Sequence, residues 1–250
     1  MRACRARQLA SAPRRPLGCA VLVSNAAEFL CIGHRGASAH EPENTLRSIR
    51  RALELGAHGV EIDVRFIDGE LIVFHDDRLD RTTDGRGRIA RQCFDYLRTL
   101  DAGKGERIPT LREVFEAVDR RAFINVELKG RRTAAPVQAL IREFLDEHGW
   151  SAEHFLVSSF NRRELRAIVD PRIRIGLLLT KPTLLYHVSA RRVRAWSVHP
   201  GVRFTTKKFV ADAHRRGLKV MPYTANKPAE IARIRAIGAD GVFTDFPERV

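Results

Sequence analysis

Three acidic side chains close two short apolar runs, and their spacing suits a metal site. Glu61 and Asp63 are two residues apart in "VEID", and Glu127 lies in "INVELK" two residues before Lys129. Residues two apart share one face of a β-strand. Three carboxylates brought together would repel one another and raise their own pKa values unless a cation neutralised them. We therefore predict that they bind one hard divalent cation, Mg²⁺ or Ca²⁺, with ion pairs to nearby arginines as the competing interpretation.

Two histidines close apolar runs and have charged neighbours. His34 ends "FLCIGH" and precedes Arg35, and His75 ends "LIVFH" and precedes two aspartates. Histidines in such places suit a general acid and a general base. Arg35 and Lys129 supply cations for a phosphate group, arginine through two parallel hydrogen bonds and lysine as a point charge. These residue types indicate proton transfer beside a bound phosphate.

Short apolar, β-branched runs alternate with longer segments of helical period from residue 29 onward, which is typical of βα units around a parallel sheet. Eight such units predict a single (β/α)8 TIM barrel, whose carboxyl-end loops carry active sites. A doubly wound sheet is less well supported, because no G-x-G-x-x-G follows the first strand. The expected strands cover residues 29–34, 58–64, 122–128, 154–159, 173–179, 194–199, 218–224 and 240–245.

The first expected helix begins after the Asn44/Thr45 pair, which we expect to cap it, and stops at Gly56. About 58 residues separate the second expected strand from the third, and a single βα connection needs far fewer. We therefore predict an insertion between the second and third barrel strands, at about residues 65–109.

Composition sets the outer limits on the fold and its partners. At 250 residues and 44% hydrophobic content the chain can bury the core of one large domain. No apolar run approaches the roughly 18 to 20 residues of a membrane span, so we predict no stable membrane insertion. The net charge is +14, but no ladder of aromatic and basic residues accompanies it. We interpret this charge as a solvated arginine-rich surface and predict no nucleic-acid partner.

The four cysteines have neither disulfide-framework nor zinc-site spacing, which favours a reducing, cytoplasmic location; they are Cys4, Cys19, Cys31 and Cys93. Residues 1–28 carry five arginines and one acid, Glu28, and look like an appendage to a domain covering residues 29–250. We expect a disordered basic arm, or a start codon assigned too far upstream. A weak secretory signal cleaved near Ala26 is the minor alternative.

Five blocks in order give the chain a family resemblance. These are "HRG" with "PENT", then "GVEIDV", "VFHDDRLDRTTDGRG", "NVELK" and "GADGVFTDFP". From about residue 30 to residue 250 the chain resembles the glycerophosphodiester phosphodiesterase family. The resemblance implies a metal-dependent TIM barrel that hydrolyses glycerophosphodiesters, as small-molecule substrates, to glycerol 3-phosphate and an alcohol.

The same resemblance implies roles for individual residues. His34 and His75 would be the acid-base pair, and we assign His34 as the base and His75 as the acid. Arg35 and Lys129 would contact the phosphate, while Glu61, Asp63 and Glu127 would hold the ion. The nucleophile would be the glycerol 2-hydroxyl of the substrate, which gives a cyclic phosphate that water then opens.

One block departs from the family pattern. The family commonly has tryptophan in "W-T-x-N", whereas this chain reads "YTAN", so Tyr223 and Asn226 become the expected substrate contacts and the preference for the alcohol group is open. Two other functions stay in competition. One is a phosphodiesterase directed at lysophospholipids or sphingolipids on the same barrel, and the other is a noncatalytic protein that binds nucleic acid or an anionic surface.

Overall fold

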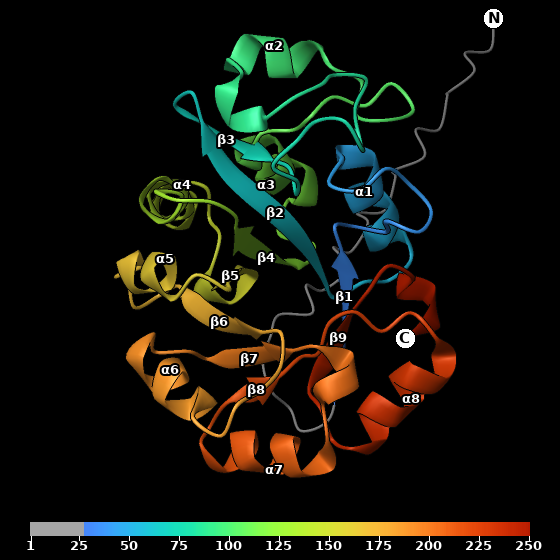
Figure 1. Cartoon of the computed structure of the whole chain (residues 1–250), viewed down its shortest axis with the longest axis vertical. Coiled ribbons are helices and arrows are strands. Elements are labelled where there is room, and N and C mark those ends of the chain that lie inside the picture. The colour runs from blue at the N-terminus through green and yellow to red at the C-terminus, as the bar shows by residue number, and fades with distance from the viewer. Residues whose placement is uncertain (1–27) are drawn as a thin grey trace, which may run out of the picture.

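The computed structural model describes residues 28–250, and the predictions for the arm lie outside that part of the chain, Glu28 apart. Its strands form a barrel with helices around it (Figure 1). The eight barrel strands are β1 (Leu30–His34), β2 (Gly59–Ile67), β4 (Phe123–Leu128), β5 (Phe155–Ser159), β6 (Arg174–Leu179), β7 (Ser197–Pro200), β8 (Lys219–Val220) and β9 (Gly241–Thr244).

The barrel is nearly closed, and the predicted (β/α)8 fold is confirmed. Neighbouring strands pair in parallel in the order β8-β7-β6-β5-β4-β2-β1-β9. Backbone hydrogen bonds link the ends of this series, among them those from Asp240 N to Val220 O and from Phe243 N to Pro222 O, both at 2.9 Å. The carboxyl ends of all eight strands therefore open on one face, where TIM barrels place their chemistry.

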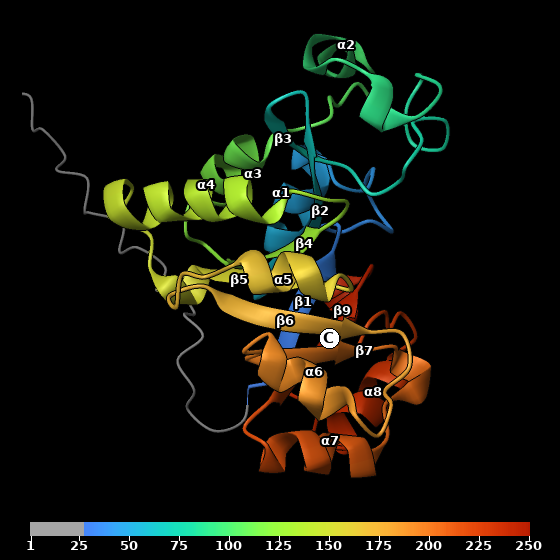
Figure 2. The same ribbon diagram turned by 60° about the vertical axis from the view of Figure 1, so that its left-hand side comes forward.

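Helices lie between successive strands on the outside of the barrel, as the two views agree (Figures 1 and 2). Within the described residues, no helix is both long and apolar enough to cross a membrane. The α-helices that follow barrel strands are α1 (Leu46–Glu54), α3 (Leu111–Val118), α4 (Ala134–Glu147), α5 (Arg162–Ala167), α6 (Tyr186–Arg192), α7 (Lys207–Arg215) and α8 (Pro228–Ala236). Short 3₁₀ turns are η2 (Ala152–His154), η3 (Val202–Phe204) and η4 (Pro247–Arg249).

The start of α1 differs from the expectation in one residue. Thr45 caps the helix, since its side chain accepts a hydrogen bond from the backbone N–H of Ser48. Asn44 does not cap; it has φ +59° and is almost fully buried. Its side chain is used elsewhere, in the site described below.

The chain between β2 and β4 carries a small second core. β3 (Glu70–Val73) pairs antiparallel with the end of β2, and η1 (Ile89–Arg91) and α2 (Phe94–Thr99) follow before α3. Because β3 gives β2 an additional partner, β2 continues to Ile67, past the predicted strand end at residue 64. The segment projects beyond the barrel in Figure 1. Its buried apolar residues are Ile72, Phe74, Leu79, Ile89, Leu97, Leu100, Ala102 and Ile108.

The turn after β1 requires glycine at position 36. Gly36 has φ +82°, and a Cβ there would lie 2.4 Å from Ser48 Oγ and 2.5 Å from the Ser48 carbonyl carbon. Ser48 is fully buried in α1, so its backbone cannot move aside without displacing the helix. Gly69 has nearly the same φ, +84°, but no atom lies within 4 Å of the place that a Cβ would take there. An alanine at either position would therefore have a strained backbone, but only an alanine at position 36 would also clash with a neighbouring residue.

We expect Gly36→Ala to lower the free energy of unfolding by about 2 to 5 kcal/mol, the sum of a left-handed backbone and an overpacked contact. The matched control Gly69→Ala should cost only about 1 to 2 kcal/mol, since it carries the backbone strain alone. Urea unfolding midpoints of the two variants measure the difference. Equal losses would mean that the contact with Ser48 does not constrain the turn.

Candidate active site

The register of the barrel strands brings the predicted site residues together. Val60 and Ile62 of β2 pack outward into the main core, which turns Glu61 and Asp63 into the barrel. Glu61 lies opposite Asn125 of β4, and Asp63 lies opposite Glu127. His34 ends β1 directly opposite Glu61. Residues far apart in the sequence therefore meet at one end of the barrel.

A cavity of about 230 Å³ opens among these side chains. Seven of the nine predicted site residues line it, namely His34, Arg35, Glu61, His75, Glu127, Lys129 and Tyr223. The remaining lining residues are Asn125, Phe160, Leu178, Thr224 and Phe243. Asp63 does not line the cavity, but it is ion-paired with Lys129, which does.

Glu61, Asp63 and Glu127 form a buried acidic cluster. Each offers a carboxylate oxygen within 4.8 Å of the others, and all three residues are at most 8% exposed. Burial, together with the charge of Asp63, raises the pKa of Glu61 to about 8. Burial and Asp63 also raise the pKa of Glu127. These raised pKa values mean that the positive charge near Glu61 and Glu127 is too small to offset the cost of ionising them in a buried place.

Two cations already lie against this cluster. Lys129 Nζ lies 2.6 Å from Glu127 Oε1 and 3.2 Å from Asp63 Oδ1, and Arg35 Nε lies 3.3 Å from Asp63 Oδ2. Burial opposes the ionisation of Asp63, but the charges of Lys129 and Arg35 outweigh it and lower the pKa of that carboxyl. The competing interpretation of the sequence, ion pairing to an arginine, is therefore realised for Asp63, whereas Glu127 pairs with Lys129.

Glu61 is compensated least. Its Oε2 accepts a hydrogen bond of 2.9 Å from the backbone N–H of Arg35. Its Oε1 is buried, as is the neighbouring Asn125 Oδ1, and neither atom has a hydrogen-bond partner within the described part of the chain. Buried polar atoms rarely stay unpaired. Oxygen donors with spare lone pairs among carboxylates suit a hard divalent cation, so these residues fit such an ion.

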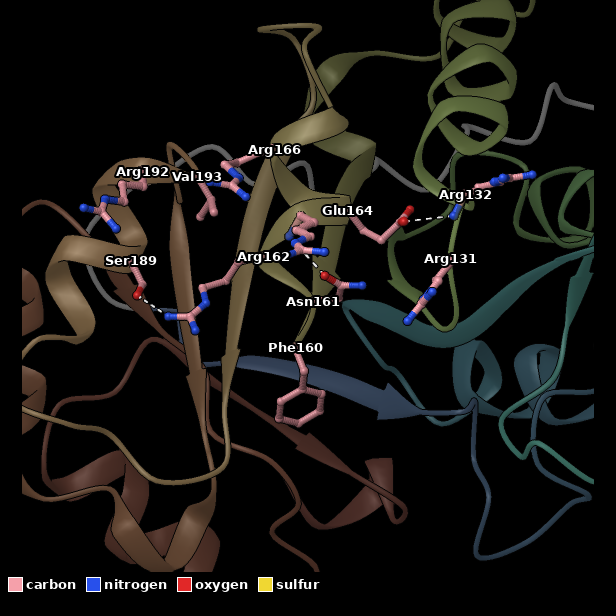
Figure 3. Close-up of a pocket in the computed structure, with 11 residues that line it drawn as sticks. Arg131, Arg132, Phe160, Asn161, Arg162, Glu164, Arg166, Ser189, Arg192 and Val193 are labelled. Atoms are coloured by element: carbon pink, nitrogen blue, oxygen red, sulfur yellow. Dashed lines mark hydrogen bonds between the residues drawn. The ribbon is translucent and has the colours of Figure 1, made fainter.

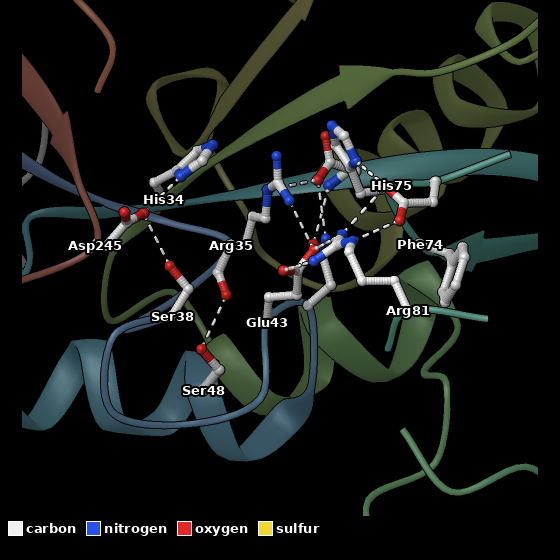
Figure 4. Close-up of polar contacts among 12 residues, drawn as sticks. His34, Arg35, Ser38, Glu43, Ser48, Phe74, His75, Arg81 and Asp245 are labelled. Carbon is white, nitrogen blue, oxygen red and sulfur yellow. Dashed lines mark hydrogen bonds and ion pairs between the residues drawn. The ribbon is translucent and has the colours of Figure 1, made fainter. Parts of the chain in front are cut away.

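His34 and His75 are each held by an aspartate. Figure 4 shows the pair of His34 and Asp245. His34 Nδ1 lies 2.7 Å from Asp245 Oδ1, and His75 Nδ1 lies 2.5 Å from Asp76 Oδ1. A carboxylate on Nδ1 orients the ring and leaves Nε2 for other partners. The two imidazoles therefore reach the cavity from different elements, one at the end of β1 and one after β3.

The surroundings shift the two histidines in opposite directions. Burial alone would lower the pKa of His34, but the hydrogen bond to Asp245 and the charge of Glu61 outweigh it and raise that pKa. Burial lowers the pKa of His75 and outweighs the opposing effects of Asp63 and Asp76. His34 therefore favours the protonated form and His75 the neutral form. These directions favour the reverse of the roles that we assigned from the sequence.

Arg35 is fixed by contacts on two sides. Its Nη1 lies 2.6 Å from Glu43 Oε1, in addition to the ion pair with Asp63. Glu43 also accepts two hydrogen bonds of 2.7 Å from Arg81 (Figure 4). Arg81 in turn binds Asp76. A chain of alternating charges therefore joins the turn after β1 to the histidine after β3.

Tyr223 and Asn226 occupy different places. Tyr223 lines the cavity, and its ring lies edge-on to that of Phe160 with centroids 5.9 Å apart. Asn226 is outside the lining. It donates from Nδ2 to Asp245 Oδ2 at 2.5 Å and accepts from the backbone N–H of Asp245 at 2.9 Å. Asn226 therefore reaches His34 only through Asp245.

Several residues of the site were not predicted from the sequence. Asp245 immediately follows β9, the neighbour of β1, so the rule that strand ends carry chemistry could have found it. Asn44 donates to Asp63 Oδ2 at 2.8 Å and accepts from the backbone N–H of Asp63 at 3.1 Å, although its position suggested a helix cap. Phe160, which is 46% exposed at the rim, gave no signal.

Comparisons with known proteins agree with this geometry. The model of the glycerophosphoryl diester phosphodiesterase family matches residues 34–249. A glycerophosphodiester phosphodiesterase of Caldanaerobacter subterraneus is 37% identical over 235 residues, which are 88% of this chain and 95% of that protein.

Two solved structures support the same conclusion. A phosphodiesterase of Oleispira antarctica in complex with the product sn-glycerol-3-phosphate has a TM-score of 0.80 and 33% identity, covering 88% of this chain and 94% of that one. The glycerophosphodiester phosphodiesterase of Thermotoga maritima has a TM-score of 0.76 and 30% identity, covering 90% and 97%. The chain described here belongs to the glycerophosphoryl diester phosphodiesterase family and is a phosphodiester hydrolase.

Proposed function

We propose that the protein hydrolyses glycerophosphodiesters to glycerol 3-phosphate and an alcohol, using one divalent cation and two histidines. One observation carries this proposal: His34 and His75 line the same cavity as Glu61 and Glu127. The product bound to the Oleispira relative supports glycerol 3-phosphate as the common part of the substrates. A cytoplasmic location stays a prediction.

The acidic cluster would hold the ion through Glu61, Asp63 and Glu127. A bound Mg²⁺ or Ca²⁺ supplies positive charge against which negative charge on phosphoryl oxygens is stabilised. Arg35 and Lys129 line the same cavity, and we propose that they contact the nonbridging oxygens of the phosphate. Asn44 and Glu43 have a positioning role, since they bind Asp63 and Arg35.

The two histidines move the protons. In the first step His75 accepts a proton from the glycerol 2-hydroxyl, and the freed oxygen attacks phosphorus. The bond from phosphorus to the departing alcohol breaks, and His34 donates a proton to that oxygen. Water then opens the resulting cyclic phosphate, with His34 taking its proton and His75 returning one to the 2-oxygen. The protein ends in its starting protonation state, with glycerol 3-phosphate as product.

This assignment of roles follows the pKa directions rather than our sequence-based assignment. A base must start neutral and an acid must start protonated. The pKa of His75 is lowered, mainly by burial, and that of His34 is raised by Asp245 and Glu61 in spite of burial. Asn226, Ser38 and His34 all bind Asp245, so the carboxylate that supports the acid is itself fixed.

A second candidate has support at the rim. Four exposed apolar residues follow neighbouring strands at the carboxyl end of the barrel, namely Phe160, Leu184, Leu185 and Phe204. A phosphodiesterase that acts on lipids would need an apolar entrance of this kind. Leu184 is 95% exposed and Leu185 is 67% exposed. A lysophospholipid could place its acyl chain against these side chains.

A substrate panel tests both candidates. After removal of metal by a chelator we expect no turnover, and restoring Mg²⁺ or Ca²⁺ should recover hydrolysis of glycerophosphocholine. Lysophosphatidylcholine should react far more slowly. The reverse preference would establish the lipid-directed candidate, and full activity of the stripped protein would refute the role of the acidic cluster.

Glu61→Gln should lower kcat by about 100-fold or more, because it removes an ion ligand. In the metal-free protein the same change should be stabilising. The folded-state pKa of Glu61 is about 8 against 4.5 for a free glutamate, so the folded state retains a proton that the unfolded state loses as pH rises through this window. The stability of the metal-free parent should therefore fall between about pH 5 and about pH 8.

Melting temperatures of metal-free parent and Glu61→Gln, measured across that window, check the sign. The advantage of the variant should grow as pH rises, and saturating metal should remove it. Glu70→Gln, an exposed change at the start of β3, is the matched control and should track the parent. If the advantage of the variant shrank as pH rose, the pKa of the buried Glu61 carboxyl would not be raised in the folded protein, and the prediction would be wrong.

The histidine roles predict a bell-shaped pH profile of kcat/KM. Activity should rise as His75 loses its proton and fall at higher pH as His34 loses its own, since their pKa values are shifted down and up respectively. Replacing either histidine by alanine should cost about 10² to 10⁴ in rate.

A glycerol nitrophenyl phosphodiester separates the two roles, because its leaving group needs no proton. It should restore most of the rate to His34→Ala and little to His75→Ala. Rescue of His75→Ala alone would instead support the roles that we assigned from the sequence. Equal defects in both variants, accompanied by weaker metal binding, would mean that the histidines serve the ion.

A further inference from the structure

A groove of about 810 Å³ lies beside the catalytic cavity, between α5 and α6 (Figure 3). Six arginines line it from three parts of the chain. Arg131 and Arg132 come from the loop after β4, and Arg192 comes from the end of α6. The other three, Arg162, Arg163 and Arg166, lie on α5. Figure 3 labels five of the six, Arg131, Arg132, Arg162, Arg166 and Arg192, which are spread along the groove.

The groove contains one carboxylate, and this carboxylate is already in use. Glu164 accepts backbone hydrogen bonds of 2.9 to 3.0 Å from Arg132, Thr133 and Ala134, at the start of α4. It therefore compensates backbone dipoles rather than guanidinium groups. The groove therefore carries six positive charges and one negative charge, and the negative charge binds backbone N–H groups rather than the arginine side chains.

None of the six guanidinium groups takes part in an ion pair with residues 28–250. The closest polar side-chain contact is neutral, from Arg162 Nη1 to Ser189 Oγ at 2.8 Å. Some exposed arginines on other helices do pair with acids: Arg112 binds Glu143 at 2.7 Å, and Arg215 binds Asp212 at 3.0 Å. Like charges without acids repel one another, and an anion in the groove would relieve that repulsion.

Two features place the groove next to the catalytic cavity. Phe160 lines both. Arg131 follows Lys129, which lines the catalytic cavity, by two residues, so their Cα atoms are at most about 7 Å apart. A ligand whose scissile phosphate lies beside Lys129 can therefore extend past Phe160 toward Arg131 and Arg162.

We propose that this groove is a second anion site, which selects glycerophosphodiesters whose alcohol part carries a further phosphate. Guanidinium groups bind phosphate through paired hydrogen bonds, and a row of them suits an extended ligand with successive phosphates. The inference rests on the proposed function, because it assigns the scissile phosphate to the catalytic cavity. It adds the class of alcohol that the enzyme prefers.

Two diesters of one scaffold test the proposal. The first is glycerophosphoglycerol, whose alcohol part is neutral, and the second is the same compound with a phosphate on its distal hydroxyl. For the parent enzyme at low salt we expect kcat/KM to be at least about tenfold higher for the phosphorylated diester, mainly through KM. The preference should shrink as salt screens the groove.

The double variant Arg131→Gln/Arg162→Gln should lose this preference and change kcat/KM for the neutral diester less than about twofold. The matched control is Arg50→Gln/Arg191→Gln, which removes the same charge from exposed positions that do not line the groove. It should keep the preference. No preference in the parent, or equal losses on both diesters in the groove variant, would overturn the proposal.

Two further outcomes are kept distinct. If vesicles containing phosphatidylglycerol bind through these arginines while the two diesters stay equivalent, the groove is a membrane-binding surface and the proposal is wrong. If the folded protein with metal hydrolyses neither these diesters nor glycerophosphocholine, the proposed function fails, and calorimetric titration with pyrophosphate then decides on the groove. Binding that the groove variant loses and the control retains supports an anion site, and equal binding by both refutes it.

Discussion

The site depends on burying three carboxylates at one end of a parallel barrel. Burial and mutual repulsion raise the pKa of Glu61 and of Glu127, so the fold must supply positive charge or lose stability. Lys129 and Arg35 supply part of it, chiefly to Asp63. Glu61 keeps a buried oxygen without a partner in the described chain. A divalent ion would complete the compensation, so the demand for charge that destabilises the metal-free barrel is also what would create affinity for the ion.

The same constraint explains the polar residues behind the cavity. A buried charged group must be oriented as well as neutralised, since each misdirected lone pair costs free energy. Asn44 satisfies Asp63 with two hydrogen bonds, and Asn226 does the same for Asp245. Both asparagines lie outside the cavity lining, yet each fixes a group that faces it or supports one that does. Specific geometry in the cavity therefore depends on amides that lie outside its lining.

Much of this could be predicted from the sequence, because strand alternation and strand-end position are local properties. The period of two in "VEID" and "INVELK" was enough to place Glu61 and Glu127 together once a barrel was inferred. Asn44 could not be assigned, because a polar residue before a helix normally caps it, and only the fold reveals that Asp63 lies within its reach. The extension of β2 to Ile67 likewise depends on its pairing with β3, which is a tertiary contact.

The pKa values of the two histidines are shifted in opposite directions, so the surroundings rather than the residue type decide which one would act as acid and which as base. Each ring has an aspartate on Nδ1, so the aspartates alone do not distinguish them. Both rings also have a second acid that raises the pKa, Glu61 for His34 and Asp63 for His75, and Arg35 lowers both pKa values. Lys129 lowers the pKa of His75 further and burial prevails there, whereas the acids prevail at His34. An ion bound at Glu61 would weaken the influence of Glu61 on His34 but leave the hydrogen bond to Asp245. The direction of proton transfer would then rest on Asp245, held in place by Asn226 and Ser38.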